Sequence, residues 1–156
     1  MNQLRRTFLK GTGAAGTVAL AIAAGLLKPG QVLAAEWNKS AFEAKTPADA
    51  LKGINAAGAA KSADIMIKAP DIAENGAVVP VEVTSKIPGT TGISILSEQN
   101  VNPLIAEFTL SNGADGYVST RIKMAKTSNV TVVVKAGGKT YIASKEVKVT
   151  IGGCGG

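Results

Sequence analysis

From residue 63 onward the chain is divided into short stretches in which apolar and polar residues alternate, separated by clusters of turn-forming residues. In one of them, Val79, Val81 and Val83 alternate with a proline and a glutamate. A period of two places successive side chains on opposite faces of a β-strand. About seven such stretches, with turn signals roughly every 8–12 residues, are typical of an immunoglobulin-like antiparallel β-sandwich. We therefore expect an all-β fold of this kind, with a Greek-key barrel as the nearest alternative.

The expected strands cover residues 65–67, 77–83, 92–97, 104–110, 117–124, 130–135 and 140–151. Asn75-Gly76 is a strong turn signal before the second of them. Pro80 indicates an edge or a bulge, because proline cannot donate a hydrogen bond to a neighbouring strand. In the last strand, Val147, Val149 and Ile151 alternate with polar residues. One face of this strand is therefore expected to stay in the core as far as Ile151.

Residues 35–62 precede the strands and are expected to form a short helical segment. Ser40 lies three residues before Glu43, and Thr46 lies three residues before Asp49. Both pairs have the spacing of a capping box, in which the first side chain caps the N-terminus of a helix. The segment is expected to pack against the β-sandwich.

The N-terminus has the three parts of an export signal. Arg5 and Arg6 open it, residues 11–27 form an uncharged run, and small residues precede a cleavage position after Ala34 or Ala35. Paired arginines followed by Phe-Leu-Lys resemble the twin-arginine signal, which is an address and not an anchor. The alternative is a transmembrane anchor, but the run is short for a span and rich in Gly and Ala. We expect a cleaved signal and no membrane segment in the mature protein.

Removal of residues 1–34 changes the charge of the chain. The whole sequence has 17 basic and 11 acidic residues, a net charge of +6. Four basic residues and no acidic ones lie in the signal, so 13 basic residues and a net charge of +2 remain. This near balance gives little support to nucleic-acid binding. The mature chain is expected to comprise the helical segment (35–62), a β-sandwich body (63–151) and a C-terminal arm (152–156).

The only cysteine of the chain, Cys154, lies in this arm between two pairs of glycines. Gly152, Gly153, Gly155 and Gly156 have no Cβ and adopt more backbone conformations than other residues. We therefore expect a flexible arm that can carry the thiol on the order of 10 Å from the body. Such an arm holds no catalytic geometry of its own, so the thiol is expected to react in the pocket of another protein.

The chain contains no histidine, which excludes Ser-His-Asp and Cys-His nucleophiles and histidine-based metal sites. A single cysteine forms neither a structural zinc site nor an internal disulfide. Met66 and Met124 are expected in the core and not in a copper site. We therefore expect no metal, no cofactor and no enzymatic activity of the chain's own. In an exported protein the Cys154 thiol is either free and reactive or paired between chains.

Several segments resemble the SoxY family, the sulfur-carrying subunits of the thiosulfate-oxidising Sox system. The most specific is Gly-Gly-Cys-Gly-Gly directly after the strand Val-Lys-Val-Thr-Ile at residues 147–151. Residues 72–76 before Val-Pro-Val at 79–81, and residues 121–126, fit the same family, as does the twin-arginine signal. The resemblance therefore extends over most of the mature chain.

This resemblance implies an immunoglobulin-like periplasmic subunit that forms a heterodimer with SoxZ. The cysteine matching Cys154 would carry thiosulfate-derived groups as a covalent adduct, without a bound cofactor. A haem cytochrome (SoxAX) would load it by forming an S–S bond, and a dimanganese hydrolase (SoxB) would release sulfate. In some organisms a sulfane dehydrogenase (SoxCD) would oxidise the remaining sulfur. The subunit would be a carrier on which these enzymes act, and not an enzyme.

Two alternatives stay open. Arg121, Lys123 and Lys126 form either a docking surface for SoxZ or for an anionic partner surface, or a solvated strand face. The whole chain could instead be an exported structural β-sandwich module that dimerises through a disulfide of Cys154. The cysteine would then serve linkage alone.

Overall fold

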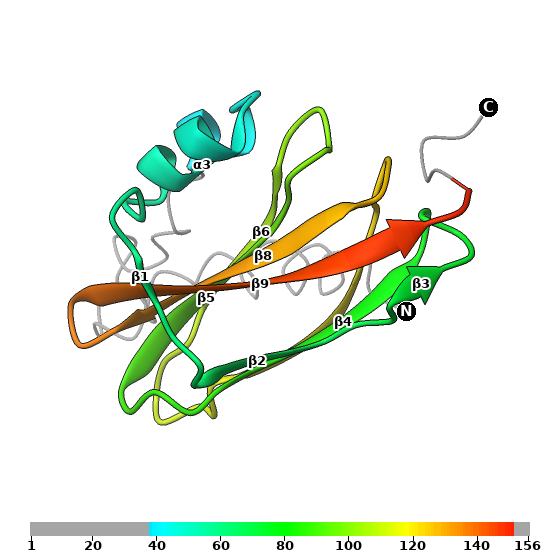
Figure 1. Ribbon diagram of the computed structural model, residues 1–156. Helices are drawn as coiled ribbons and strands as arrows, with labels where there is room; N and C mark the ends of the chain where they lie inside the picture. The colour runs from blue at the N-terminus through cyan, green and yellow to red at the C-terminus, as the bar shows by residue number, and fades with distance from the viewer. Residues whose placement is uncertain (1–37, 152–156) are drawn as a thin grey trace, which may run out of the picture. The chain divides into compact units, whose positions relative to one another are not determined.

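The computed structural model describes residues 38–151, so the predicted export signal and the C-terminal arm lie outside the described residues (Figure 1). Within residues 38–151 the chain forms two short helices and nine strands. They are α2 (Lys39–Phe42), α3 (Pro47–Gly53), β1 (Ala60–Lys61), β2 (Ile65–Lys68), β3 (Ile72–Ala73), β4 (Val79–Ser85), β5 (Thr90–Ser97), β6 (Leu104–Thr109), β7 (Tyr117–Ile122), β8 (Ser128–Ala136) and β9 (Lys139–Val149).

The strands form two sheets that pack face to face (Figure 1). The larger sheet has the order β1-β9-β8-β5-β6, with β3 added beside β9, and the smaller sheet has the order β2-β4-β7. The longer strands pair antiparallel, whereas the two-residue strands β1 and β3 pair with β9 in parallel. Helices α2 and α3 lie on the outer face of the larger sheet. The predicted antiparallel β-sandwich with a short N-terminal helical segment is confirmed.

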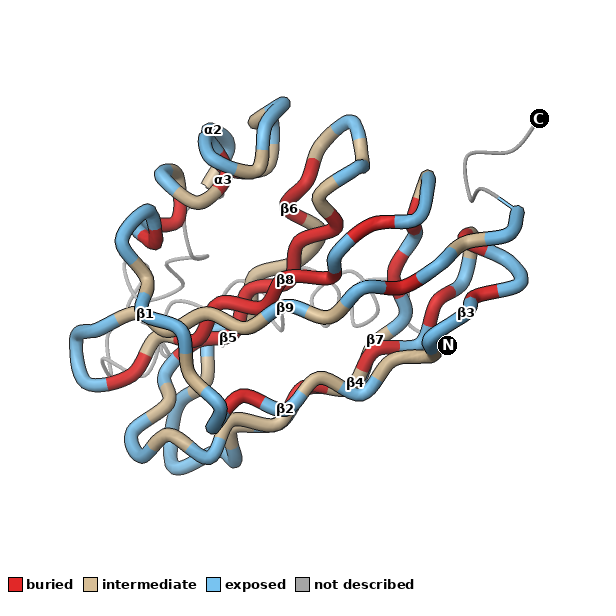
Figure 2. Tube along the Cα trace, viewed as in Figure 1, coloured by how far each residue is buried: buried red, intermediate tan, exposed pale blue. Residues whose placement is uncertain are grey.

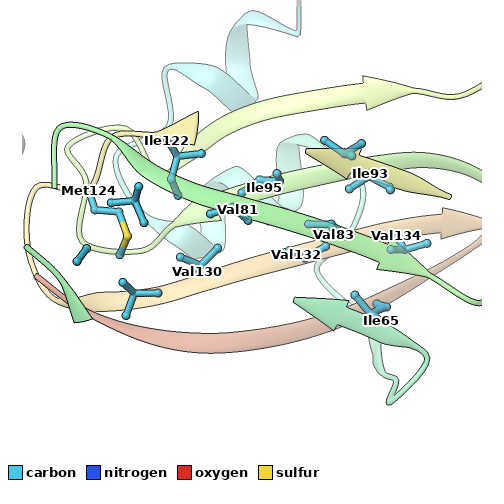
Figure 3. Close-up of a cluster of buried hydrophobic side chains, with 14 of the residues drawn as sticks. Ile65, Val81, Val83, Ile93, Ile95, Ile122, Met124, Val130, Val132 and Val134 are labelled. Atoms are coloured by element: carbon cyan, nitrogen blue, oxygen red, sulfur yellow. The ribbon is translucent and has the colours of Figure 1, made fainter. Parts of the chain in front are cut away.

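Six of the fifteen buried residues in the core between the sheets are valines on β4 and β8. Val81 and Val83 of β4 lie opposite Val132 and Val134 of β8, and all four are 0% exposed (Figure 3). Fully burying one such side chain contributes about 1.5–3 kcal/mol. Figure 2 shows buried residues concentrated along the strands that face the other sheet. The alternation seen in the sequence therefore selects the residues that hold the two sheets together.

The opposite face of the larger sheet is covered by the helices. Val133 of β8 joins Leu96 of β5 and Ile54, at the end of α3, in a second buried cluster. Gly53 permits the close approach of the two helices, because a Cβ at this position would lie 2.7 Å from the Cα of Ala41. The helical segment is thus part of the folded body.

Helix α3 begins as the sequence predicts. The Thr46 hydroxyl accepts a hydrogen bond from the Asp49 amide at 3.1 Å and donates one to the Asp49 carboxylate at 2.7 Å. This hydrogen bond, followed by the contact with Lys52, lowers the pKa of Asp49. Thr46 is therefore both the cap of the helix and a partner of the carboxylate.

Helix α2 begins earlier than predicted, and the expected cap at Ser40 is wrong. Asn38 is the cap, and its side-chain oxygen accepts a hydrogen bond from the Ala41 amide at 3.4 Å. The amide nitrogen of the same side chain donates to the Gly53 carbonyl at 3.0 Å. An asparagine can do both, which a serine hydroxyl at position 40 cannot, because Ser40 already lies inside the helix.

Two further predictions concern the sheets. Met124 is buried as predicted, but Met66 is 51% exposed, so its predicted core position is wrong. In β2 the buried position is taken by Ile65, and the next side chain faces solvent.

Strand β2 pairs with β4 only from Glu82 onward, so Pro80 has a neighbouring strand on one side alone, as an edge proline requires.

Candidate functional site at the root of the C-terminal arm

The residues from which the arm leaves the body, Val149, Thr150 and Ile151, are called the root here. Val147 is fully buried and Val149 is half-buried, but Ile151 is 68% exposed. The prediction that alternation keeps Ile151 in the core is therefore wrong. The physical reason is that the last register pair of β9 is Val149 with Ala73, so Ile151 lies beyond the end of the sheet.

The root is held by backbone hydrogen bonds and not by burial of its side chains. The amide of Thr150 donates to the carbonyl of Ala73 at 3.1 Å, and the amide of Gly76 donates to the carbonyl of Ile151 at 2.8 Å. The Thr150 hydroxyl adds a bond to the carbonyl of Glu74 at 3.0 Å. Figure 1 shows β3 beside the end of β9 at this end of the sandwich. The backbone is thus fixed as far as the residue that precedes the arm.

The Asn75-Gly76 turn does more than reverse the chain. The Asn75 side-chain oxygen accepts a hydrogen bond from the Ala77 amide at 2.8 Å, as expected of a turn asparagine. The carbonyl of Gly76 also accepts a bond from the Met124 amide at 2.7 Å, while its own amide donates to Ile151. The turn therefore links the segment after β7 to the root. Sequence reasoning identified the turn but gave no signal for this role, because both partners are remote in the chain.

Thr127, which directly precedes β8, binds the backbone of the root at Val149. Its hydroxyl oxygen accepts a hydrogen bond from the Val149 amide at 2.8 Å and lies 3.5 Å from the Val149 carbonyl, to which it donates. The register of β8 with β9 ends at Ser128 and Val147, so the Thr127 side chain takes the place of a strand backbone. This residue was not singled out from the sequence, since one threonine in a turn carries no distinctive pattern.

The three predicted docking residues, Arg121, Lys123 and Lys126, are exposed. Arg121 lies in β7 opposite Pro80, Lys123 follows the end of that strand, and Lys126 immediately precedes Thr127. In the described part of the chain none of the three forms an ion pair. The structure therefore brings Lys126 to the root, whereas Arg121 belongs to the outer face of the smaller sheet. Docking by these residues stays a prediction.

One ion pair lies beside the root. Lys145 of β9 lies 3.0 Å from the Asp71 carboxylate and also donates to the Ala69 carbonyl at 2.6 Å. Lys148 is exposed on the same strand, and its amide donates to the Asp71 carbonyl at 3.0 Å. These contacts hold the segment before β3 against β9, although an exposed ion pair by itself adds only about 0–1 kcal/mol.

Among residues 38–151, no group of three or more Asp, Glu, Cys or His side chains is placed to hold a metal ion. No helix in this part of the chain is long and apolar enough to cross a membrane. Cys154 and Gly152, Gly153, Gly155 and Gly156 lie outside the described residues, so their roles stay predictions. The site that the structure does describe is the root that presents them.

Comparison with known proteins finds a matching family model and similar solved structures. The family model described as "Sulfur oxidation protein SoxY" matches residues 52–154. The solved structure of the sulfur carrier protein SoxY from Chlorobium limicola f thiosulfatophilum has 47% sequence identity and a TM-score of 0.62, covering 73% of this chain and 100% of that chain. A variant of a superoxide reductase (neelaredoxin) from Ignicoccus hospitalis has 18% identity and a TM-score of 0.50, covering 67% and 92% of the two chains, a likeness of fold alone. A comparison with curated proteins gave no significant match.

Proposed function

The chain belongs to the SoxY family, whose role is that of a sulfur carrier in sulfur oxidation, and we propose that Cys154 is the residue on which it carries sulfur. The observation that carries this proposal is the extent of the family match, which runs to Cys154 itself. Cys154 is also the only cysteine in the sequence. No other side chain of the protein can form an S–S bond to a sulfur substrate.

The proposed cycle uses thiosulfate as the source of sulfur. The Cys154 thiolate and thiosulfate are joined by an S–S bond, and the two electrons released pass to a haem cytochrome of the SoxAX type. Water then cleaves the terminal sulfonate of this S-thiosulfonate in a dimanganese hydrolase of the SoxB type. Sulfate and two protons leave, and a persulfide stays on Cys154. A persulfide sulfur can be oxidised further by a sulfane dehydrogenase or transferred to a thiol acceptor.

The fold supports this cycle by fixing the point from which the arm starts. The hydrogen bond from Gly76 to Ile151 and those of Thr150 hold the chain up to the arm. The glycines on either side of Cys154 add no side chain, so an enzyme pocket needs only the width of a backbone to admit the thiol. Each residue that becomes ordered in such a pocket costs about 1–2 kcal/mol of backbone entropy. That cost favours quick release, which suits a carrier that visits several enzymes.

The proposal includes a location and partners. The twin-arginine pattern at Arg5 and Arg6 would direct export to the periplasm, where the enzymes of thiosulfate oxidation would act on the protein. The carrier would work as a heterodimer with SoxZ. The redox and hydrolytic steps, with their metals and haems, belong to the partner enzymes in this scheme.

Mass spectrometry of the intact protein tests the proposal. The mature protein is purified with its partner subunit and incubated with thiosulfate and the cognate haem cytochrome. We expect a mass increase of one thiosulfate-derived group on the wild-type chain and none on Cys154→Ser. A disulfide-linked dimer or an unmodified thiol as the sole product would contradict the proposal and favour the structural-module alternative.

A further inference from the structure

The sequence contains two Asn-Gly-Ala segments, at residues 75–77 and 112–114. An asparagine followed by glycine is the pair at which a side-chain amide reacts most readily with the main chain, because glycine has no Cβ to hinder the approach of its nitrogen. Both pairs lie in turns, and both asparagines are exposed. Since the two segments have the same three residues, a difference in their reactivity must come mainly from the contacts of each turn.

The reaction at Asn75 is intramolecular and needs only water. The Gly76 nitrogen gives up its proton and forms a bond to Cγ of Asn75, the bond from Cγ to the side-chain nitrogen breaks, and ammonia leaves with that proton. Water then opens the resulting five-membered succinimide at one of its two carbonyl carbons. Opening at Cγ gives aspartate. Opening at the main-chain carbon gives isoaspartate, in which the main chain runs through Cβ and Cγ.

The fold closes this reaction at Asn75. The Gly76 amide donates its proton to the Ile151 carbonyl at 2.8 Å, and Gly76 is buried. The Met124 amide holds the Gly76 carbonyl at 2.7 Å, so the residue is fixed on both sides. The Asn75 side chain is folded back on the turn by its bond from the Ala77 amide at 2.8 Å. A buried, hydrogen-bonded amide loses its proton only when the surrounding structure opens.

The second pair has no such protection. Within residues 38–151 the Gly113 amide donates no hydrogen bond, and Gly113 is exposed. Asn112 and Gly113 have φ of 56° and 74°, a conformation that asparagine and glycine adopt more readily than other residues. The turn is closed by the Ala114 amide, which donates to the Ser111 carbonyl at 3.1 Å. The Gly113 nitrogen is therefore free to lose its proton to solvent.

We propose that Asn75 is a modification site, at which conversion to aspartate or isoaspartate is controlled by the hydrogen bond from Gly76 to Ile151. The side chain reacts only while the root is open. Isoaspartate lengthens the main chain by one carbon, so Gly76 can no longer donate to Ile151 and accept from Met124 at the same time. The modification itself does not depend on the proposed carrier function. In a carrier it would release the point from which the arm starts.

Peptide mapping of the full-length mature chain tests the proposal. The protein is incubated in mildly alkaline buffer, folded or unfolded in urea, and conversion at positions 75 and 112 is followed by mass spectrometry, with isoaspartate separated by chromatography. In the folded protein we expect Asn112 to convert at least about tenfold faster than Asn75. In urea the two rates should agree within about twofold, since the segments then differ little. Equal rates in the folded protein overturn the proposal, and so does a tenfold difference that persists in urea.

A variant at the root tests the link between opening and modification. Thr150→Val removes the hydroxyl that donates to the Glu74 carbonyl at 3.0 Å. We expect it to speed conversion of Asn75 about fivefold and to leave Asn112 unchanged. Thr150→Ser keeps the hydroxyl and should convert at the wild-type rate, and unfolding midpoints show that both variants are folded. Equal conversion of Asn75 in Thr150→Val and in the wild type contradicts control by the root.

Hydrogen exchange measures the consequence of the modification. The Thr150 amide donates to the Ala73 carbonyl at 3.1 Å, so its exchange reports whether the root is closed. Protein that contains isoaspartate at position 75 is separated from unconverted protein, and we expect the Thr150 amide to exchange about tenfold faster in it. Conversion at Asn112 is the control and should leave this exchange unchanged. An equal exchange rate before and after conversion at position 75 would show that the modification does not open the root.

Discussion

The Gly76 amide donates a 2.8 Å hydrogen bond to the Ile151 carbonyl, and so a turn before β4 holds the last described residue of the chain. The same turn accepts a bond from Met124 through the Gly76 carbonyl. Three segments that are remote in sequence therefore meet at the point where the arm begins. In the proposed function this arrangement gives the arm a fixed starting point, which a frayed strand end would not provide.

Thr127→Val is expected to loosen the root without unfolding the protein. The substitution removes the hydroxyl that accepts a bond from the Val149 amide at 2.8 Å and keeps a similar volume. The lost bond should lower the free energy of unfolding by about 1 kcal/mol. Hydrogen exchange of the Val149 and Thr150 amides should become faster by about tenfold. Thr109→Val is the control, because Thr109 lies at an exposed strand end and its side chain forms no hydrogen bond within residues 38–151. Unchanged exchange at Val149 would show that Thr127 does not hold the root.

Gly153→Val is expected to slow the loading of Cys154 and to leave the fold unchanged. A branched side chain next to the cysteine widens the arm and restricts its backbone. The measurement is the rate of thiosulfate loading by the haem cytochrome, together with the unfolding midpoint. Gly58→Val is the matched control, since an added Cβ at Gly58 would meet nothing within 4 Å. Equal loading rates for both variants would disprove the need for a thin arm.

Gly53→Ala is expected to destabilise the helical segment, although alanine favours helices by up to about 1 kcal/mol relative to glycine. The added Cβ would lie 2.7 Å from the Cα and the Cβ of Ala41, so the two helices must move apart. Overpacking of this kind costs about 1–3 kcal/mol. Urea unfolding measures the change, with Gly58→Ala as the control in open space. A gain of stability in Gly53→Ala would show that the helices separate without cost.

Asp49→Asn is expected to lower the free energy of unfolding at pH values above the pKa of the Asp49 carboxylate. Below that pKa the wild-type carboxyl is protonated, so the charge-dependent difference between the two proteins should disappear. The hydrogen bond from Thr46 and the nearby Lys52 lower the pKa of Asp49 in the folded chain relative to its ordinary value of 3.8. The stabilisation from the ionised group is therefore present above pH 3.8 and is lost as the pH falls through the lower, folded pKa. Thermal unfolding of both proteins between neutral pH and acid measures the effect. A difference in stability that stays constant over this range would contradict the assignment.

The sequence predicted some elements well because their signals are local. Thr46 caps α3 because a threonine, a proline and an aspartate stand at the right spacing within a few residues. The valines of β4 are buried because a period of two leaves one apolar face. Met66 could not be placed in the same way. It follows Ile65 and precedes Ile67 in a continuous apolar run, and only the pairing of β2 with β4 decides which side chains face the core.

The candidate site likewise has features that local sequence signals predict and features that only tertiary contacts decide. The sequence by itself determined the sandwich class, the single cysteine and the family motif, since strand period and a terminal glycine-cysteine pattern are written in adjacent residues. Only the tertiary structure decided how the arm is held. Ile151 continues the alternation of Val147 and Val149, yet it is exposed, because the sheet ends before it. Its backbone is fixed by Gly76, and a hydrogen bond between residues so distant in the chain forms only when β3 has paired with the end of β9.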